Sequence, residues 1–148
     1  MILTKNNCDR NLLIEGATKI EAECFSDSWS ARSVEGQLMA DGSVFFCSAD
    51  EKGNITGYVC GQMLADECEL YRIAVTDKHR GKGYAKELMT RFIEECRDND
   101  VSGIFLEVRS SNTPARTLYE RYGFQNVGVR KNYYSAPTDD AIIYRCDI

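Results

Sequence analysis

The chain has 148 residues, of which 43% are hydrophobic and 28% charged, and a formal net charge of −5 from 18 basic and 23 acidic side chains. These values fit one globular domain over residues 1–148 and exclude a disordered or fibrous chain. The acidic balance argues against general nucleic-acid binding, which needs a basic face, and suits a cationic partner. No apolar run approaches the roughly 20 residues of a membrane-spanning helix. The N-terminus also lacks the pattern of a secretory signal, so we expect a cytoplasmic protein that does not bind a membrane.

The first half of the chain divides by its apolar periodicity. An N-terminal strand comes first, and two helices follow it, the second directly after Trp29-Ser30. Two β-rich runs with a turn between them are typical of a hairpin, and a third strand completes this half. The expected ranges are helices through 13–24 and around 34–38, strands 43–49 and 55–64 with a turn at 50–54, a turn at 65–67, and a strand at 69–75.

The second half begins with the clearest helix, an apolar stripe at helical spacing. A later helix is expected to begin at Thr113 as N-cap and Pro114 as first residue, with Asn112 as a competing cap, and to end at Gly123. The alternation of strands and helices indicates an α/β or α+β domain. The expected ranges are a helix at 85–96, a turn at 98–100, and strands at 104–108, 124–133 and 141–146.

Seven cysteines are many for this length, but an odd number cannot all pair within one chain. None of them forms a Cys-x-x-Cys arrangement, and the single histidine, His79, leaves few ligands for a zinc ion. Free and mostly buried thiols in a reducing compartment are the simpler interpretation. We therefore expect no metal site, and we expect His79 to be a solvated loop residue.

The segment from Ile73 to Ala85 joins the third strand of the first half to the long helix through glycines. Gly81 and Gly83 let the backbone approach an anion, and unpaired N–H groups at the positive end of the helix attract its charge. Arg80 and Lys82 add side-chain charge. The spacing matches neither the Walker A pattern nor the dinucleotide fingerprint, so the segment predicts a different carrier of a pyrophosphate.

The run Arg80-Gly81-Lys82-Gly83-Tyr84-Ala85 resembles the Arg/Gln-x-x-Gly-x-Gly/Ala signature of the GNAT superfamily of acetyl-CoA-dependent N-acetyltransferases, with Ala85 where many relatives have glycine. The chain looks most like the RimI branch, which acetylates the N-terminal alanine of a ribosomal protein, over nearly its full length. The family implies a GNAT fold, in which helices flank a central mixed, mostly antiparallel sheet. The other matching segments are Glu23-Cys24-Phe25 with Trp29-Ser30, Ile73-Ala74-Val75, Leu106-Glu107-Val108-Arg109 with Asn112, Leu118-Tyr119-Glu120 with Gly123-Phe124, Arg130-Lys131-Asn132-Tyr133-Tyr134, and Asp140-Ala141.

The resemblance implies that Glu107 is the general base and Tyr119 the general acid of acetyl transfer. Elementary chemistry agrees, because the attacking amine must lose a proton and the departing thiolate must gain one. An α-amine, with a reference pKa of about 7.7–8.0, is neutral at physiological pH far more readily than a lysine amine at about 10.4. The resemblance also implies contacts with acetyl-CoA, the co-substrate, from Ile73, Ala74, Val75, Arg80, Gly81, Lys82, Gly83, Tyr84, Ala85, Lys86 and Asn112.

Taken without the resemblance, several of these residues have ordinary explanations. Glu107 alternates with apolar neighbours, as a solvent-facing carboxylate on a strand does. The sequence neighbours of Tyr119 are those expected of an aromatic residue in the core. Trp29, the only tryptophan, either packs between the first helices or forms a wall of the substrate cleft. The run 130–134 is either a solvated strand edge or a lid on the substrate side. Adjacent residues such as Tyr133 and Tyr134 point to opposite faces of a strand, so one of them is expected to be exposed, which favours the lid.

The sequence therefore predicts direct transfer of an acetyl group, without a covalent enzyme intermediate, to the N-terminal amine of a ribosomal or other protein, with alanine as the expected first residue. An acetyltransferase for a small amine or a lysine side chain is the alternative among enzymes. A non-catalytic acyl-CoA sensor is the alternative from another class, and the presence of both Glu107 and Tyr119 speaks against it.

Overall fold

The computed structural model describes residues 1–148. Seven strands form one sheet in the order β1-β2-β3-β4-β5-β7-β6, and all neighbouring pairs are antiparallel except β4 and β5. This mixed, mostly antiparallel sheet with flanking helices confirms the expected fold class. The strands are β1 (Ile2–Leu3), β2 (Ser43–Ala49), β3 (Ile55–Leu64), β4 (Glu67–Val75), β5 (Gly103–Arg109), β6 (Gln125–Tyr134) and β7 (Asp139–Asp147). The helices are α1 (Arg10–Cys24), α2 (Ala31–Met39), the short 3-10 helix η1 (Asp77–His79), α3 (Tyr84–Asp98) and α4 (Thr113–Arg121).

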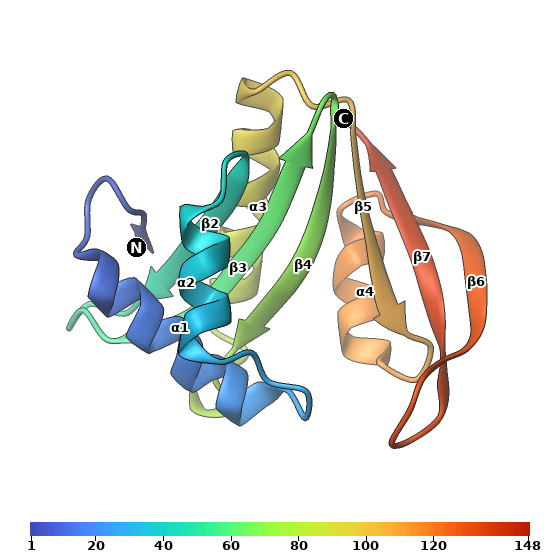
Figure 1. Ribbon diagram of the computed structural model, residues 1–148, viewed down its shortest axis with the longest axis horizontal. Helices are drawn as coiled ribbons and strands as arrows, with labels where there is room; N and C mark the ends of the chain where they lie inside the picture. Colours follow the sequence, from blue (N-terminus) through green and yellow to red (C-terminus); the bar gives the residue numbers. More distant parts are fainter.

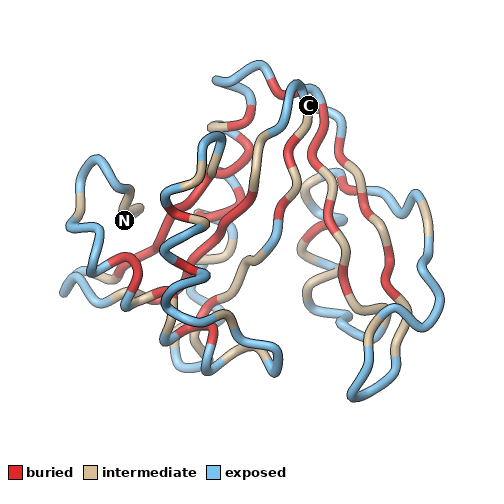
Figure 2. The backbone as a smooth tube through the Cα atoms, in the orientation of Figure 1, coloured by how far each residue is buried: buried red, intermediate tan, exposed pale blue.

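Helices cover both faces of the sheet (Figure 1). α1 and α2 pack on one face in a cluster that includes Leu13, Val34 and Tyr58. α3 and α4 pack on the other face, in a larger cluster that includes Phe92 and Tyr119. Figure 2 shows the buried stretches along the central strands, whereas β6, the edge strand, is largely exposed. Residues along a central strand therefore alternate between two apolar layers.

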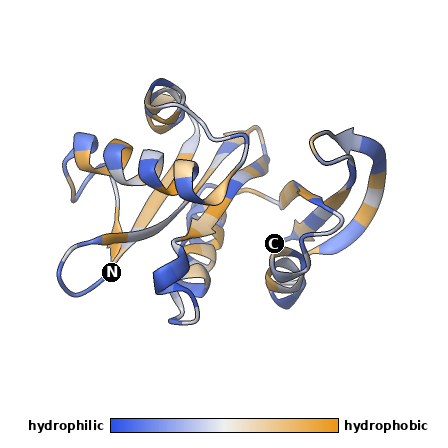
Figure 3. Ribbon diagram, turned by 90° about the horizontal axis from the view of Figure 1, so that it is seen from below, coloured by the Kyte–Doolittle hydropathy of each residue, from blue (hydrophilic) through white to orange (hydrophobic).

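β4 and β5 pair at only three positions, from Glu67 opposite Gly103 to Glu69 opposite Phe105. Beyond these positions the strands diverge, and the sheet opens in a V (Figure 1). Figure 3 shows the result from below, with β5, α4, β6 and β7 standing apart from the other elements. At the closed end the Arg145 guanidinium of β7 lies over Gly103 and forms an ion pair with Glu67. This contact ties β7 to β4 where the divergence begins.

β4 carries a β-bulge beside the opening. Cys60 on β3 pairs with Arg72, whereas the next residue, Gly61, pairs two positions earlier on β4, so that Tyr71 is the extra residue. A Cβ at Gly61 would collide with the carbonyl oxygen of Glu69, which explains why glycine occupies this position. A bulge bends its strand and re-aims its side chains, and Tyr71 is 40% exposed.

The structure corrects the expected ends of β4 and α3. Glu67, expected in a turn, belongs to β4, because it pairs with Leu64 and with the first residue of β5. The turn is reduced to Ala65, which has a positive φ of 55°, and Asp66. Asp98, also expected in a turn, is the last residue of α3.

The ends of α4 differ from the expectation as well. Asn112 is the N-cap in place of Thr113, because its side-chain oxygen accepts a hydrogen bond from the N–H of Ala115 at 3.3 Å. The helix ends at Arg121, and Gly123 follows it with the left-handed φ of 88° that favours glycine. The other expected elements are present: β2 and β3 have the expected bounds, and the ends of the rest differ by a few residues.

All seven cysteines are free, and five of them are buried. Burial raises the pKa of the Cys60 thiol to about 12, which suppresses the reactive thiolate. No group of three or more His, Cys, Asp or Glu side chains is arranged to hold a metal ion. No helix combines the length and the apolar character that crossing a membrane requires.

Gly61→Ala is expected to lower the free energy of unfolding by about 1–3 kcal/mol, the usual cost of forcing atoms into a packed site. The added methyl group meets both the β4 backbone and the ring of Phe92. Urea denaturation measures the change, and Gly36→Ala is the control, because a Cβ there meets nothing within 4 Å and α2 gains a better helix former. Equal stability of Gly61→Ala and the wild type would contradict this role for the glycine.

Candidate active site

A cleft of about 730 Å³ lies where β4 and β5 diverge. Its walls are the end of α1, the last residues of β4, the loop that leads into α3, and one face of α4. Of the cofactor contacts expected from the sequence, all except Lys82 line this cleft. Sequence reasoning missed the other lining residues, which are Cys24, Phe25, His79, Pro114, Ala115, Thr117, Leu118 and Arg121. Most of these come from α4, whose approach to β4 no local pattern could predict.

The glycine loop presents unpaired backbone donors to this cleft. Gly81 and Gly83 have φ values of 76° and 89°, and a Cβ at either position would meet nothing within 4 Å. Glycine is therefore needed for the backbone conformation and not for space. Gly83 is the N-cap of α3, and no side chain caps the first turn. The N–H groups of that turn remain available to an anion at the positive end of the helix.

Arg80 supports the loop itself. Its Nε donates to the carbonyl oxygen of Val75 at 3.1 Å, and its Nη1 lies 3.3 Å from a carboxylate oxygen of Asp77. The guanidinium thus folds back onto the end of β4. Lys82 does not line the cleft, whereas Arg80 and Lys86 do, so the expected anion site offers both backbone amides and charged side chains.

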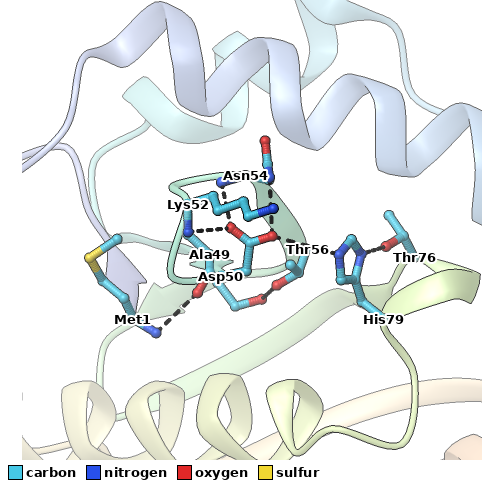
Figure 4. Close-up of polar contacts among 9 residues, drawn as sticks. Met1, Ala49, Asp50, Lys52, Asn54, Thr56, Thr76 and His79 are labelled. Atoms are coloured by element: carbon cyan, nitrogen blue, oxygen red, sulfur yellow. Dashed lines mark hydrogen bonds and ion pairs between the residues drawn. The ribbon is translucent and has the colours of Figure 1, made fainter.

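His79 connects this loop to the hairpin between β2 and β3 (Figure 4). Its Nδ1 lies 2.7 Å from the hydroxyl of Thr76, and its Nε2 lies 3.9 Å from a carboxylate oxygen of Asp50. The same Asp50 carboxylate accepts hydrogen bonds from Asn54 and Lys52 within the hairpin turn. These bonds lower the pKa of Asp50. The side chain of His79 is only 13% exposed, so the expectation of a solvated residue was wrong.

Glu107 lies on the face of the sheet that carries α1 and α2, because Leu106 and Val108 point into the opposite core. It is 26% exposed, and its Oε1 lies 3.3 Å from Nε of Arg130 on β6. Glu69 shares this face across the gap. Burial raises the pKa of Glu69, the Glu107 carboxylate raises it further, and Arg130 opposes the shift. Two carboxylates and one guanidinium therefore meet where the strands separate.

Tyr119 is a core residue of α4. It is buried between Phe124 and Tyr144, whose ring centroids are 5.8 and 6.2 Å away. Its hydroxyl has no hydrogen-bond partner within the chain, whereas that of Tyr144 bonds to the neighbouring Glu120. Burial, and then the nearby Tyr134, raise the pKa of Tyr119. The raised pKa of Tyr119 increases the difference from the reference thiol pKa of about 8.5, and the hydroxyl stays protonated at neutral pH.

Tyr134 lies at the end of β6, close to both candidate catalytic residues. Burial raises its pKa, and the Glu107 carboxylate adds to the shift. The Arg109 guanidinium lies 4.5 Å from the centre of the Tyr134 ring and donates to the carbonyl oxygens of Pro137 and Ser135. Arg109 therefore fixes the β6–β7 loop beside the cleft.

Tyr133 is 52% exposed and meets the Tyr134 ring edge-on, with 5.1 Å between the centroids. Trp29 lies between α1 and α2 in the sequence, and its ring meets Tyr71 of the bulge, with 6.2 Å between the centroids. The structure thus places Trp29 against β4, beside the opening, and Tyr133 and Tyr134 on the arm formed by β6 and β7.

The comparison with protein families agrees with this geometry. A family model described as the acetyltransferase (GNAT) family matches residues 14–124. The chain belongs to the GNAT family. The resemblance inferred from the glycine loop and the other segments is confirmed, and so is the expectation of an acetyltransferase.

Two enzymes named [ribosomal protein bS18]-alanine N-acetyltransferase are among the relatives of this GNAT protein. The Haemophilus ducreyi enzyme is 41% identical over 87 residues, which cover 59% of this chain and 60% of that one. The Salmonella typhimurium enzyme is 30% identical over 132 residues, or 88% of each chain. The crystal structure of the ribosomal-protein-S18-alanine N-acetyltransferase from Escherichia coli superposes with a TM-score of 0.89 at 27% identity, covering 100% of this chain and 93% of that one.

The cleft of this GNAT protein fits the donor that the family uses. Acetyl-CoA supplies a thioester whose acyl carbon is open to attack by an amine. Beyond Glu69, β4 has no strand partner on the β5 side, so the backbone groups of that edge, apart from the Val75 carbonyl oxygen that Arg80 bonds, have no strand to pair with and can bond an amide-containing ligand. The uncapped first turn of α3 suits a diphosphate. Both features open into the same cavity.

Gly83→Ala is expected to weaken the binding of acetyl-CoA by about 5- to 30-fold, the equivalent of the roughly 1–2 kcal/mol that a left-handed backbone costs a residue with a Cβ. Isothermal titration measures the dissociation constant. Gly53→Ala is the matched control, because Gly53 has a φ of 84°, meets equally open space, and lies in the β2–β3 hairpin. The same loss of affinity in both variants would refute a specific role for Gly83.

Proposed function

We propose that this GNAT enzyme transfers the acetyl group of acetyl-CoA directly to the N-terminal alanine of ribosomal protein bS18. The observation that carries the proposal is its likeness, over most of both chains, to the Salmonella typhimurium enzyme of that name. Glu107 belongs to β5 and Tyr119 to α4, two elements beside the opening. Glu107 supplies the base and Tyr119 the acid that such a transfer needs.

Glu107 accepts the proton that the amine loses. The carboxylate is partly exposed, so water can reach it and relay the proton from an amine that does not touch it directly. Its ion pair with Arg130, at 3.3 Å, holds the carboxylate beside the opening. An α-amine suits a carboxylate base of this kind better than a lysine amine does, because less work is needed to deprotonate it.

Tyr119 donates a proton to the thiolate that leaves. Its hydroxyl stays protonated at neutral pH, because burial raises its pKa. The residue belongs to the same helix as Ala115 and Leu118, which line the cofactor cleft. Packing against Phe124 and Tyr144 holds the ring in one orientation, as a proton donor requires.

The backbone of residues 80–86 binds the diphosphate of acetyl-CoA, and residues 73–75 and Asn112 contact the rest of the carrier. Trp29, Tyr133 and Tyr134 form the acceptor side. Two carboxylates, Glu69 and Glu107, face one guanidinium, that of Arg130, and this excess of negative charge suits a positively charged N-terminus. The free thiols agree with a cytoplasmic enzyme, the compartment in which ribosomal proteins would meet it.

The direct test incubates the enzyme and acetyl-CoA with a peptide that copies the N-terminus of bS18. Intact-mass analysis should show one added acetyl group, located on the α-amine by fragmentation. A copy of the peptide with a blocked α-amine and intact lysines is the control. Acetylation of that blocked peptide, or only of small amines, would replace the proposal by the corresponding alternative, and binding without release of coenzyme A would indicate a sensor.

Tyr119→Phe is expected to lower kcat by about 10²-fold or more, the scale of general acid catalysis, with unchanged affinity for acetyl-CoA. Steady-state thiol release measures kcat, and titration measures the affinity. Tyr144→Phe, which removes the hydroxyl of an adjacent buried tyrosine, is the matched control. Unchanged turnover in Tyr119→Phe would remove this residue from the mechanism.

A further inference from the structure

A buried ion pair joins α1 to β4 beside the bulge. Glu21 is completely buried, and the side chain of Arg72 is only 12% exposed. Arg72 Nε lies 3.3 Å from Oε2 of Glu21 and makes no hydrogen bond, so the contact between them is an ion pair. The hydroxyl of Tyr58, on β3, donates a hydrogen bond to the same carboxylate oxygen. One oxygen of Glu21 therefore serves two strands of the sheet.

Both members of the pair also hold the segment Phe25–Trp29, which we call the acceptor loop. The other oxygen of Glu21 accepts a hydrogen bond from the backbone N–H of Trp29 at 2.9 Å. Arg72 Nη2 donates to the carbonyl oxygen of Asp27 at 3.1 Å, and Nη1 lies 3.5 Å from the Asp27 carboxylate. The guanidinium also lies 4.3 Å from the centre of the Phe25 ring and 5.0 Å from that of the Trp29 ring.

The energetics of such a pair favour a role in positioning the acceptor loop over a role in stabilising the fold. Two charges lose their water on burial, and the attraction between them often does no more than offset that loss. The acceptor loop has no helix or strand of its own, so its conformation depends on these contacts. Arg72 touches the loop at its beginning, middle and end, which makes it the residue that most directly sets the loop's place.

The acceptor loop lies where the acceptor amine must arrive. Its Trp29 ring meets Tyr71, the extra residue of the bulge, next to Arg72 in the chain. The Asp27 carboxylate is close enough to Tyr134 to contribute to the raised pKa of that tyrosine, so the loop faces the β6–β7 arm across the opening. Phe25, at the other end of the loop, lines the acetyl-CoA cleft. The loop therefore borders both substrates.

We infer that Arg72 and Glu21 are positioning residues that fix the acceptor loop as the wall against which the peptide N-terminus docks. The inference rests on the proposed function for the identity of the acceptor. Neither residue needs to touch the reacting atoms, since Glu21 is enclosed and Arg72 is covered by two aromatic rings. Their effect is on the binding and alignment of the peptide, and not on the binding of acetyl-CoA.

Arg72→Lys tests this inference, because it keeps the charge beside Glu21 and removes the planar group that reaches Asp27 and the two rings. We expect kcat/KM for the peptide to fall by about 10- to 100-fold, the scale of a small misplacement, mainly through KM, while the dissociation constant of acetyl-CoA is unchanged. Trp29 is the only tryptophan, so acrylamide quenching of its fluorescence reports the loop directly and should increase.

Arg91→Lys is the matched control, since Arg91 also lies over an aromatic ring, that of Phe46 at 4.6 Å, and pairs with Glu95, but it belongs to the middle of α3. It should leave both readouts unchanged. The double variant Glu21→Gln with Arg72→Met removes both charges together and avoids a lone buried charge. It should unfold at a similar denaturant concentration to the wild type and still show a higher peptide KM and stronger quenching.

Wild-type quenching and wild-type peptide KM in Arg72→Lys and in the double variant would overturn the inference, as would equal losses for the peptide and acetyl-CoA. These outcomes are separate from failure of the proposed function. If the wild type acetylates no bS18 peptide but accepts another amine, the proposed function fails. The positioning role is then judged by the same quenching measurement and by the KM of the amine that is accepted.

Discussion

The separation of β4 from β5 is the feature on which the rest of the structure depends. Two parallel strands that stayed paired would satisfy each other's backbone groups and leave no room between them. Here the pairing stops after Glu69, and the exposed edge of β4 faces a cavity. The ion pair between Arg145 and Glu67 across Gly103 closes one end, and the core around α3 and α4 supports the two diverging arms from behind. The cofactor cleft and the acceptor side are therefore both consequences of one interruption in the sheet.

The polar groups around the opening divide between main chain and side chains. The candidate anion site offers the backbone amides at the uncapped start of α3, and the side chains of Arg80 and His79, which line the same cleft, brace the loop. On the acceptor side the arrangement is reversed, because buried and half-buried side chains set the geometry. Glu21 and Arg72 hold one wall, and Arg109 holds the other. Each wall thus contains a guanidinium that lies over at least one aromatic ring.

Much of the fold was predictable, because apolar periodicity is a local property. The expected ranges of β2 and β3 agree with the structure, and the stripe that predicted α3 coincides with its buried face. The glycine loop was predictable for the same reason, because a left-handed backbone conformation favours glycine, and glycines are visible in the sequence. The roles of Glu107 and Tyr119, in contrast, came from the family resemblance. Nothing in an alternating strand distinguishes Glu107 from an ordinary exposed carboxylate.

The features that escaped prediction all depend on contacts between distant segments. The burial of Arg72 is one example, since an arginine between Tyr71 and Ile73 reads as an exposed residue until Glu21 is placed against it. The burial of His79 is another, because its partner Asp50 belongs to a hairpin 29 positions earlier in the chain. The capping of α4 by Asn112 was left open between two adjacent residues, and only the hydrogen bond to Ala115 separates them.

The outer border of the sheet has a further consequence. β6 forms one border, and its unpaired side is a potential template for another chain. Its pairing with β7 is irregular at two places, Asn132 adopts a positive φ of 51°, and Arg130 and Lys131 place charges there. The opposite border, β1, is only two residues long. Irregularity at one border and brevity at the other both discourage the pairing of this open sheet with the sheet edge of another chain.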